Sequence, residues 1–295
     1  MRITTAVSSE VSTYRSLRIG LVFAVITIGL AIGQVIATSD CAQSSISAYW
    51  YTPARTVFVG ALYAAGTILI AYRGDSAVED TLLDLAGFAA IVVAAVPTWA
   101  PSGRCGPVDL TDPTAFVDVS VPAIGGVAAA AGVLAQVLLD PGVDTRSLRW
   151  CRHRLLRRLE HAARRFGRLA LSVAGTIVLL THAVDAVGFR RDAHAVAAIG
   201  LFVAIIGVVL TQALRSRSRA DSRSHAFGLG YLVVAGAMGL TLVLTILAHT
   251  ALDATGSRLL IIEATLLAEF AVYWLLQTVE RWQPAPDVAI SSILS

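Results

Sequence analysis

The sequence of 295 residues contains no lysine and no asparagine, and charged residues make up only 15% of it. The absence of lysine excludes any cofactor that is held as a lysine Schiff base, such as retinal. Soluble domains carry about 25% charged residues, so the low charge also argues against a soluble fold. Cysteine is limited to three residues, and the zinc-binding spacings His-x-x-x-His and His-Glu-x-x-His do not occur. A nucleophile elbow, a phosphate-binding loop and a haem-attachment motif are missing as well.

Long apolar segments take up most of the chain. Apolar residues make up 56% of it, and the mean hydropathy is +0.71. A helix that crosses a bilayer core of about 30 Å needs roughly 20 apolar residues. We therefore expect an all-α polytopic membrane protein, a bundle of eight transmembrane helices, without a separate soluble domain. The expected spans are Arg18–Thr38, Thr56–Tyr72, Leu82–Trp99, Val119–Leu139, Leu169–Val187, Ala195–Leu214, Phe227–His249 and Leu259–Val279.

All 23 basic residues are arginines, and their positions predict the orientation of the spans. If the spans alternate in direction, all but five arginines fall at the two termini and in the loops of one side. Cytoplasmic loops carry the excess of basic residues, so both termini are expected in the cytoplasm and the chain in the plasma (inner) membrane. The first segment could instead be a cleaved signal peptide, but its long N-terminal lead and full-length apolar run favour a retained anchor. The five arginines on the other side are Arg55, Arg104, Arg190, Arg191 and Arg258.

The positions of the cysteines agree with the predicted orientation of the spans. Cys41 follows the first expected span and Cys105 the third, so both are expected outside, where an oxidising environment permits a disulfide. We predict a Cys41–Cys105 bond, against the alternative of unrelated thiols. Cys151 falls in an inner loop and is expected to stay reduced.

A basic segment at residues 140–168 separates two expected halves, the four-helix units at 1–139 and 169–295. Its apolar residues, from Leu148 to Phe166, recur every three or four positions, which predicts an amphipathic helix in the membrane interface. Anionic phospholipid is the expected partner, since each arginine near an anionic surface contributes on the order of 1 kcal/mol. A plain topology anchor and a scaffold for a protein partner are the alternatives, whereas nucleic acid is not expected because no binding motif occurs. The arginines expected to contact lipid are Arg149, Arg152, Arg157, Arg158, Arg164 and Arg165.

Two polar stripes run along the last two spans at steps of four residues. One contains Thr245 and His249, and the other contains Glu269. A carboxylate near the bilayer centre is costly unless it faces the bundle interior and is bonded or protonated, so Glu269 is the strongest single functional candidate. We predict a ligand-binding cavity among spans five to eight, lined by Glu269, Tyr273, Thr265, Gln277 and Thr245.

Histidines and aspartates gather at the outer ends of the same four spans. Imidazoles combined with carboxylates can bind zinc and activate a water molecule, or they can relay protons. The plainer alternative is that helix ends at the interface collect such residues because they are solvated there. The candidate metal ligands are His182, Asp185, His194, His249 and Asp253.

The loop after the first span contains the aromatic run Tyr49–Tyr51, which is typical of the membrane interface. A family resemblance begins here: residues 45–74, SISAYWYTPARTVFVGALYAAGTILIAYRG, resemble a family of uncharacterised multi-pass membrane proteins common in actinobacteria. The stretches AHAVAAIGLFVAIIGVVL from Ala193 and EFAVYWLLQTVERW from Glu269 are similar to later segments of that family. The resemblance implies about eight spans and a bacterial inner membrane, and no activity. A looser likeness to the alkaline ceramidases and adiponectin-type receptors implies a His/Asp zinc site, although their paired-His motif is missing here.

The leading hypothesis is a non-enzymatic membrane protein that binds, and in one version transports, a lipid or small molecule in the polar cavity. Two alternatives stay open. One is a zinc-dependent intramembrane hydrolase that uses the outer His/Asp cluster, which one bound zinc per chain would reveal. The other is a scaffold that recruits a partner or anionic lipid through the basic helix, which charge reversal of Arg157 and Arg158 would test.

Overall fold

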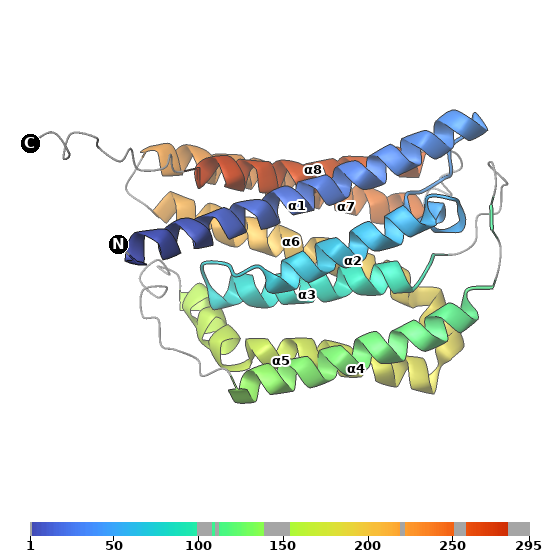
Figure 1. Cartoon of the computed structure of the whole chain (residues 1–295), viewed down its shortest axis with the longest axis horizontal. Coiled ribbons are helices and arrows are strands. Elements are labelled where there is room, and N and C mark those ends of the chain that lie inside the picture. Colours follow the sequence, from blue (N-terminus) through green and yellow to red (C-terminus); the bar gives the residue numbers. More distant parts are fainter. Residues whose placement is uncertain are drawn as a thin grey trace, which may run out of the picture.

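The computed structural model describes residues 2–98, 108–109, 112–138, 154–218, 222–250 and 258–282. All regular structure in these ranges is helical, so the expected all-α fold is confirmed for them (Figure 1). One short 3₁₀ helix, η1, lies between the first two long helices. The elements are α1 (Arg2–Ser39), η1 (Ser47–Tyr51), α2 (Arg55–Ala71), α3 (Ala77–Ala95), α4 (Thr114–Leu138), α5 (Arg154–Val184), α6 (Ala186–Ser218), α7 (Ser222–Thr250) and α8 (Arg258–Glu280).

The long helices run back and forth along one axis, so their ends gather at two ends of the bundle (Figure 1). The terminal end holds the start of α1, the turn between α2 and α3 at residues 72–76, and the end of α8. The η1 end holds η1 and the junction between α5 and α6. Each expected span overlaps one long helix, because a long apolar run without internal breaks favours a continuous helix. Three helices begin well before the expected spans, namely α1, α5 and α6.

Six helices share the main core. Fully buried side chains from α1, α3, α6, α7 and α8 meet there, and α2 joins them. The pair formed by α4 and α5 packs against the outside of α3 (Figure 1). The core therefore joins helices from both expected halves, 1–139 and 169–295, instead of forming one core in each. Representative core residues are Leu21, Leu83, Ile205, Met238 and Trp274.

Glycines allow two helix pairs to approach closely. A Cβ atom at Gly66 of α2 would lie 2.6 Å from the carbonyl oxygen of Gly87 in α3. A Cβ atom at Gly175 of α5 would lie equally close, at 2.6 Å, to the carbonyl oxygen of Gly125 in α4. No side chain fits at these crossings, and close backbone contact between small residues is a common basis of helix packing in membranes.

The outward faces of the helices are apolar. Leu30 is 70% exposed, Val119 75% and Val184 86%. Soluble proteins rarely expose large contiguous apolar surfaces, so this surface is that of a membrane protein. Within the described ranges, α1, α4, α6, α7 and α8 are long and apolar enough to cross a membrane, and α5 makes a sixth candidate if its two bent parts form one span. Since α2 has only 17 residues and α3 carries three acidic residues, eight spans stay a prediction.

The described part of the basic segment, residues 154–168, forms the first part of α5, which is bent by 65° from the apolar part that follows Gly167. Its apolar residues Leu159 and Phe166 are 47% and 52% exposed, so this face is free to meet a membrane surface. On the opposite face, Glu160 is buried and accepts the backbone N–H of Ala77 at 3.1 Å, which caps the start of α3. Arg164 binds the same carboxylate at 3.2 Å. The expected lipid contacts Arg149 and Arg152 lie outside the described residues, whereas Arg157, Arg158 and Arg165 are exposed.

The predicted disulfide is not settled by the structure. Cys41 follows α1 at the η1 end, whereas Cys105 and Cys151 lie outside the described residues. The Cys41–Cys105 bond therefore stays a prediction.

Candidate functional site

A cavity of about 390 Å³ lies near the η1 end, between α1, α2 and α3 on one side and α6, α7 and α8 on the other. Most of its wall is apolar and includes Ile28, Phe58, Val93 and Leu266. The cavity thus includes walls from spans six to eight, which were expected to line a cavity, and also from the first three helices. Its polar groups are Ser47, Thr98, Arg191, His194, Thr245, His249 and Glu263.

The η1 segment closes one side of this cavity because its aromatic residues are folded into the bundle. Tyr49, Trp50 and Tyr51 are at most 3% exposed, so they belong to the core and not to an interfacial belt. The Tyr51 hydroxyl donates to the carbonyl oxygen of Thr98 at 2.7 Å. The guanidinium of Arg55 lies 3.6 Å from the centre of the Trp50 ring, an arrangement that adds a cation–π attraction.

Glu263 joins η1 to the start of α8. Its Oε2 accepts the backbone N–H of Ile46 at 2.6 Å, and the backbone N–H of Leu260 donates to the carbonyl oxygen of Ser44 at 2.9 Å. No arginine or histidine of the described residues lies within ion-pair distance of the Glu263 carboxylate. The sequence places Glu263 near the outer end of the last span, but nothing in its spacing distinguishes it from a solvated helix-end residue.

His194 ties three elements together. Its Nδ1 lies 2.6 Å from the carbonyl oxygen of Val96 after α3, and its Nε2 lies 2.8 Å from the hydroxyl of Ser47 in η1. A carbonyl can only accept, so Nδ1 carries the proton, and neutral Nε2 accepts from the serine. Both ring nitrogens are therefore occupied, and His194 serves as a cross-link in the cavity wall in place of a metal ligand.

The remaining predicted metal ligands are spread apart. The Nε2 of His182 lies 3.5 Å from Asp118 of α4, and Asp185 accepts a backbone N–H at the start of α6. His249 lines the cavity, and Asp253 lies outside the described residues. Among the residues that the structure describes, no three His, Cys, Asp or Glu side chains are grouped so as to hold a metal ion.

The polar residues that were expected to form one stripe on α8 lie in different environments. Thr265 is exposed, and Glu269 is half-buried and accepts a hydrogen bond from a threonine hydroxyl of α7 at 3.0 Å. Tyr273 and Gln277 are fully buried nearer the terminal end, where the Gln277 amide donates to the Tyr273 hydroxyl at 3.1 Å. Of the five predicted ligand-binding residues, only Thr245 lines the cavity.

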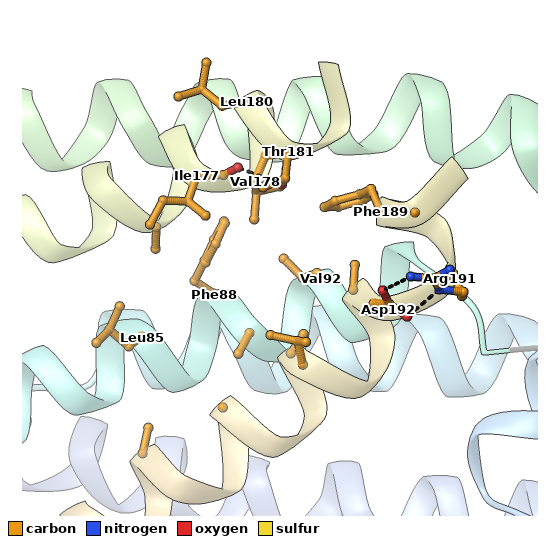
Figure 2. A pocket seen from close by; sticks show the side chains of 18 of the residues that line it. Leu85, Phe88, Val92, Ile177, Val178, Leu180, Thr181, Phe189, Arg191 and Asp192 are labelled. Carbon is orange, nitrogen blue, oxygen red and sulfur yellow. Dashed lines mark hydrogen bonds and ion pairs between the residues drawn. The ribbon is translucent and has the colours of Figure 1, made fainter. Parts of the chain in front are cut away.

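A second hollow of about 900 Å³ lies between α3, α5 and α6, and its walls are almost wholly apolar. Figure 2 shows Phe88 and Val92 of α3 facing Ile177 and Val178 of α5 across it. At its polar edge, Arg191 donates two hydrogen bonds to the neighbouring Asp192, at 2.9 and 2.8 Å. The Arg191 side chain lines both hollows, which therefore lie next to each other across α6.

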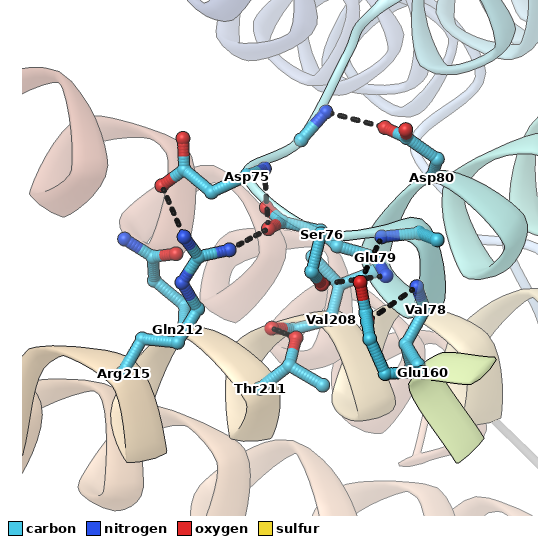
Figure 3. A network of polar contacts seen from close by, with 12 residues as sticks. Asp75, Ser76, Val78, Glu79, Asp80, Glu160, Val208, Thr211, Gln212 and Arg215 are labelled. Atoms are coloured by element: carbon cyan, nitrogen blue, oxygen red, sulfur yellow. Dashed lines mark hydrogen bonds and ion pairs between the residues drawn. The ribbon is translucent and has the colours of Figure 1, made fainter. Parts of the chain in front are cut away.

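The terminal end is filled by polar side chains that bind one another (Figure 3). Arg281, just after α8, donates to both oxygens of Asp75 in the turn between α2 and α3. Arg215 of α6 lies 3.9 Å from the carboxylates of Asp75 and Glu79. The negative charge of Asp75 raises the pKa of Arg281 above its usual range, against the lowering effect of burial.

A second part of this network links α6, α7 and α8. Glu280 accepts hydrogen bonds from the Tyr231 hydroxyl at 2.6 Å, from the Ser216 hydroxyl at 3.0 Å and from the Gln212 amide at 3.3 Å. The three donor residues are at most 1% exposed. Multiple hydrogen bonds of this kind compensate for the removal of the carboxylate from water.

Comparison with known proteins assigns this chain to no family. No family model matches it, and no curated protein or solved structure is significantly similar to it. The expected resemblance to an actinobacterial membrane family thus stays a prediction, and function has to be inferred from the geometry of the site.

Proposed function

We propose that all eight long helices cross the membrane and that the terminal end faces the cytoplasm. In support, α2 and α3 run between the same two ends as the candidate spans (Figure 1). The acidic residues Glu79 and Asp80 lie in the first turn of α3, where a span would meet water. The start of α5 and the end of α6 bring Arg157, Arg158 and Arg217 to the terminal end, as the positive-inside rule requires.

We propose further that the protein binds a small amphipathic molecule in the cavity at the η1 end. The observation that carries this proposal is the Glu263 carboxylate, which lines a mostly apolar cavity and has no cationic side chain of the described residues within ion-pair distance. A buried carboxylate without a counter-charge is costly, and a ligand group that donates hydrogen bonds or carries positive charge would offset that cost. Ligand sites commonly have volumes of about 300–1,000 Å³, apolar walls and a few polar groups. The cavity of about 390 Å³ suits a small molecule better than a whole phospholipid.

Native mass spectrometry of the protein released gently from its own membrane tests this function. We expect wild type to retain an amphipathic small molecule and Glu263→Gln to lose it. The matched control is Glu269→Gln, which changes a half-buried carboxylate on the same helix outside the cavity and should keep the ligand. Retention by Glu263→Gln, or the absence of any ligand from wild type, would contradict the proposal.

A second candidate function is attachment of the cytoplasmic surface to anionic lipid through the first part of α5. The exposed residues Leu159 and Phe166 favour it, because they can enter the interface while Glu160 holds the opposite face on α3. Replacing Arg157 and Arg158 with glutamate should reduce the anionic phospholipid that copurifies with the protein. An unchanged lipid content would leave the segment as a topology anchor.

A further inference from the structure

The most unusual carboxylate of the terminal end is that of Glu79. It lies in the first turn of α3, ahead of the apolar stretch that begins at Leu82, and its side chain is 0% exposed. Its Oε2 accepts the backbone N–H of Asp75 at 2.9 Å and lies 3.9 Å from Nη1 of Arg215. Its Oε1 is buried and has no hydrogen-bond partner among the residues that the structure describes. Buried polar atoms are usually hydrogen-bonded, so Oε1 is the atom of Glu79 at which a bound proton would lower the cost of burial.

Charged and titratable groups approach Glu79 from every element packed around it. Two carboxylates, those of Asp75 and Glu79, lie close to two guanidinium groups, those of Arg215 and Arg281. Addition of a proton to Glu79 removes one negative charge from this balanced set and weakens the attraction between α3 and Arg215 of α6. The surrounding groups are Tyr72 and Asp75 of the turn after α2, Glu160 of α5 at the same helix end, Arg215 of α6, Tyr273 of α8 and Arg281 after α8.

The pKa of the Glu79 carboxyl agrees with this geometry. Burial raises the pKa of Glu79 to about 7, the negative charge of Asp75 raises it further, and Arg281 and Arg215 act in the opposite direction. The ordinary pKa of glutamate is 4.5, so this shift brings both protonation states of Glu79 into the neutral pH range.

We propose that Glu79 is a proton-binding site of the terminal end, which exchanges its proton with the adjacent aqueous phase past Asp75. Asp75 provides this route because its side chain is 27% exposed, whereas that of Glu79 is 0% exposed. A proton from water binds Oε1 and converts the carboxylate into a carboxylic acid, and its release restores the ion-pair attraction to Arg215. This inference is independent of ligand binding at Glu263, and either one can fail without the other.

Infrared difference spectroscopy of the purified protein between pH 5 and pH 8 tests the proposal, because a protonated carboxyl has a C=O stretch that a carboxylate lacks. We expect wild type to show such a band and Glu79→Gln to lose the component of it whose midpoint lies near neutral pH. The control Asp192→Asn changes an exposed carboxylate and should keep that component. A band whose intensity in Glu79→Gln equals that of wild type overturns the assignment.

Two further variants decide the question if Glu79→Gln does not fold. Asp75→Asn removes the neighbouring negative charge and should move the midpoint of the band to lower pH. Arg215→Gln removes a neighbouring positive charge and should move it to higher pH. A midpoint that neither variant moves would place the titrating group elsewhere and overturn the proposal.

Discussion

Buried polar groups have different surroundings at the two ends of the bundle. At the η1 end, Glu263 and His194 are held mainly by loop atoms and line a hollow space. At the terminal end, Asp75 and Glu280 bind arginine, tyrosine and serine side chains from several helices. The comparison shows that similar residue types form either a cavity or a closed network, depending on whether neighbouring helices supply complementary side chains.

The largest expected effect tests whether the η1 end depends on apolar packing. Trp50→Ala removes an aromatic side chain that is 1% exposed and should lower the free energy of unfolding by about 4 kcal/mol. Thermal unfolding in detergent, followed by light scattering, measures the change. The control Trp282→Ala alters a side chain that is 54% exposed and contacts Arg15, so a loss of only about 1 kcal/mol is expected. Equal effects would mean that η1 is not part of the core.

The next effect tests whether the terminal end depends on paired charges. Arg281→Gln leaves Asp75 without its bidentate partner and should cost about 3 kcal/mol of stability. This is the low end of the usual range because the two side chains are 28% and 27% exposed. Arg191→Gln is the matched control, since the pair with Asp192 is 61% and 57% exposed and should contribute less than about 1 kcal/mol. If both variants lose the same stability, the network contributes no more to the free energy of unfolding than a surface ion pair does.

The pH dependence of stability tests the buried carboxyl of the terminal end. The pKa of Glu79 is about 7 in the folded chain, above the ordinary value of 4.5, so the folded state holds the proton more tightly than the unfolded state. The resulting stability is complete below about pH 4.5 and is lost as the pH rises to about 7, with a total of roughly 1–3 kcal/mol. Glu79→Gln should therefore gain stability relative to wild type between pH 5 and pH 8. Melting curves of both proteins across this range that stay parallel would contradict the assignment.

The smallest effect on stability is expected at the cavity itself. Glu263→Gln keeps an oxygen that can accept the Ile46 N–H and removes an uncompensated charge, so stability should change by less than about 1 kcal/mol. Thermal unfolding of ligand-free protein measures this change apart from ligand loss. A destabilisation as large as that of Arg281→Gln would indicate that Glu263 is a structural anchor and not part of a binding site.

The helices could be predicted from the sequence because an apolar run of about 20 residues has few alternatives in a membrane, where every backbone polar group needs an internal partner. The candidate site was predicted only in part. His194, Thr245 and His249 do line the cavity, but Glu269 binds a threonine outside it, and His182 belongs to another corner of the bundle. Periodicity along one helix identifies residues on a common face, but it does not say which neighbouring helix covers that face.

The carboxylates that matter most depend on contacts between distant parts of the chain. Asp75 and Arg281 are 206 positions apart, and Glu263 and Ile46 are 217 apart. In the sequence, each of these charged residues resembles an ordinary solvated residue at the end of a helix. The burial of Glu79 could not be predicted from the sequence, since this residue lies among the polar residues that precede an apolar run.

The order and length of the apolar runs were enough to specify a helical membrane protein and the positions of its long helices, because burial of apolar surface and satisfaction of the backbone depend on local composition. The α4–α5 pair on the outside of α3, the η1 aromatics inside the core and the partner of each buried carboxylate arose only when the helices packed. Hydrogen bonds and ion pairs form at separations of about 3–4 Å, and distance along the chain does not specify which groups will come that close.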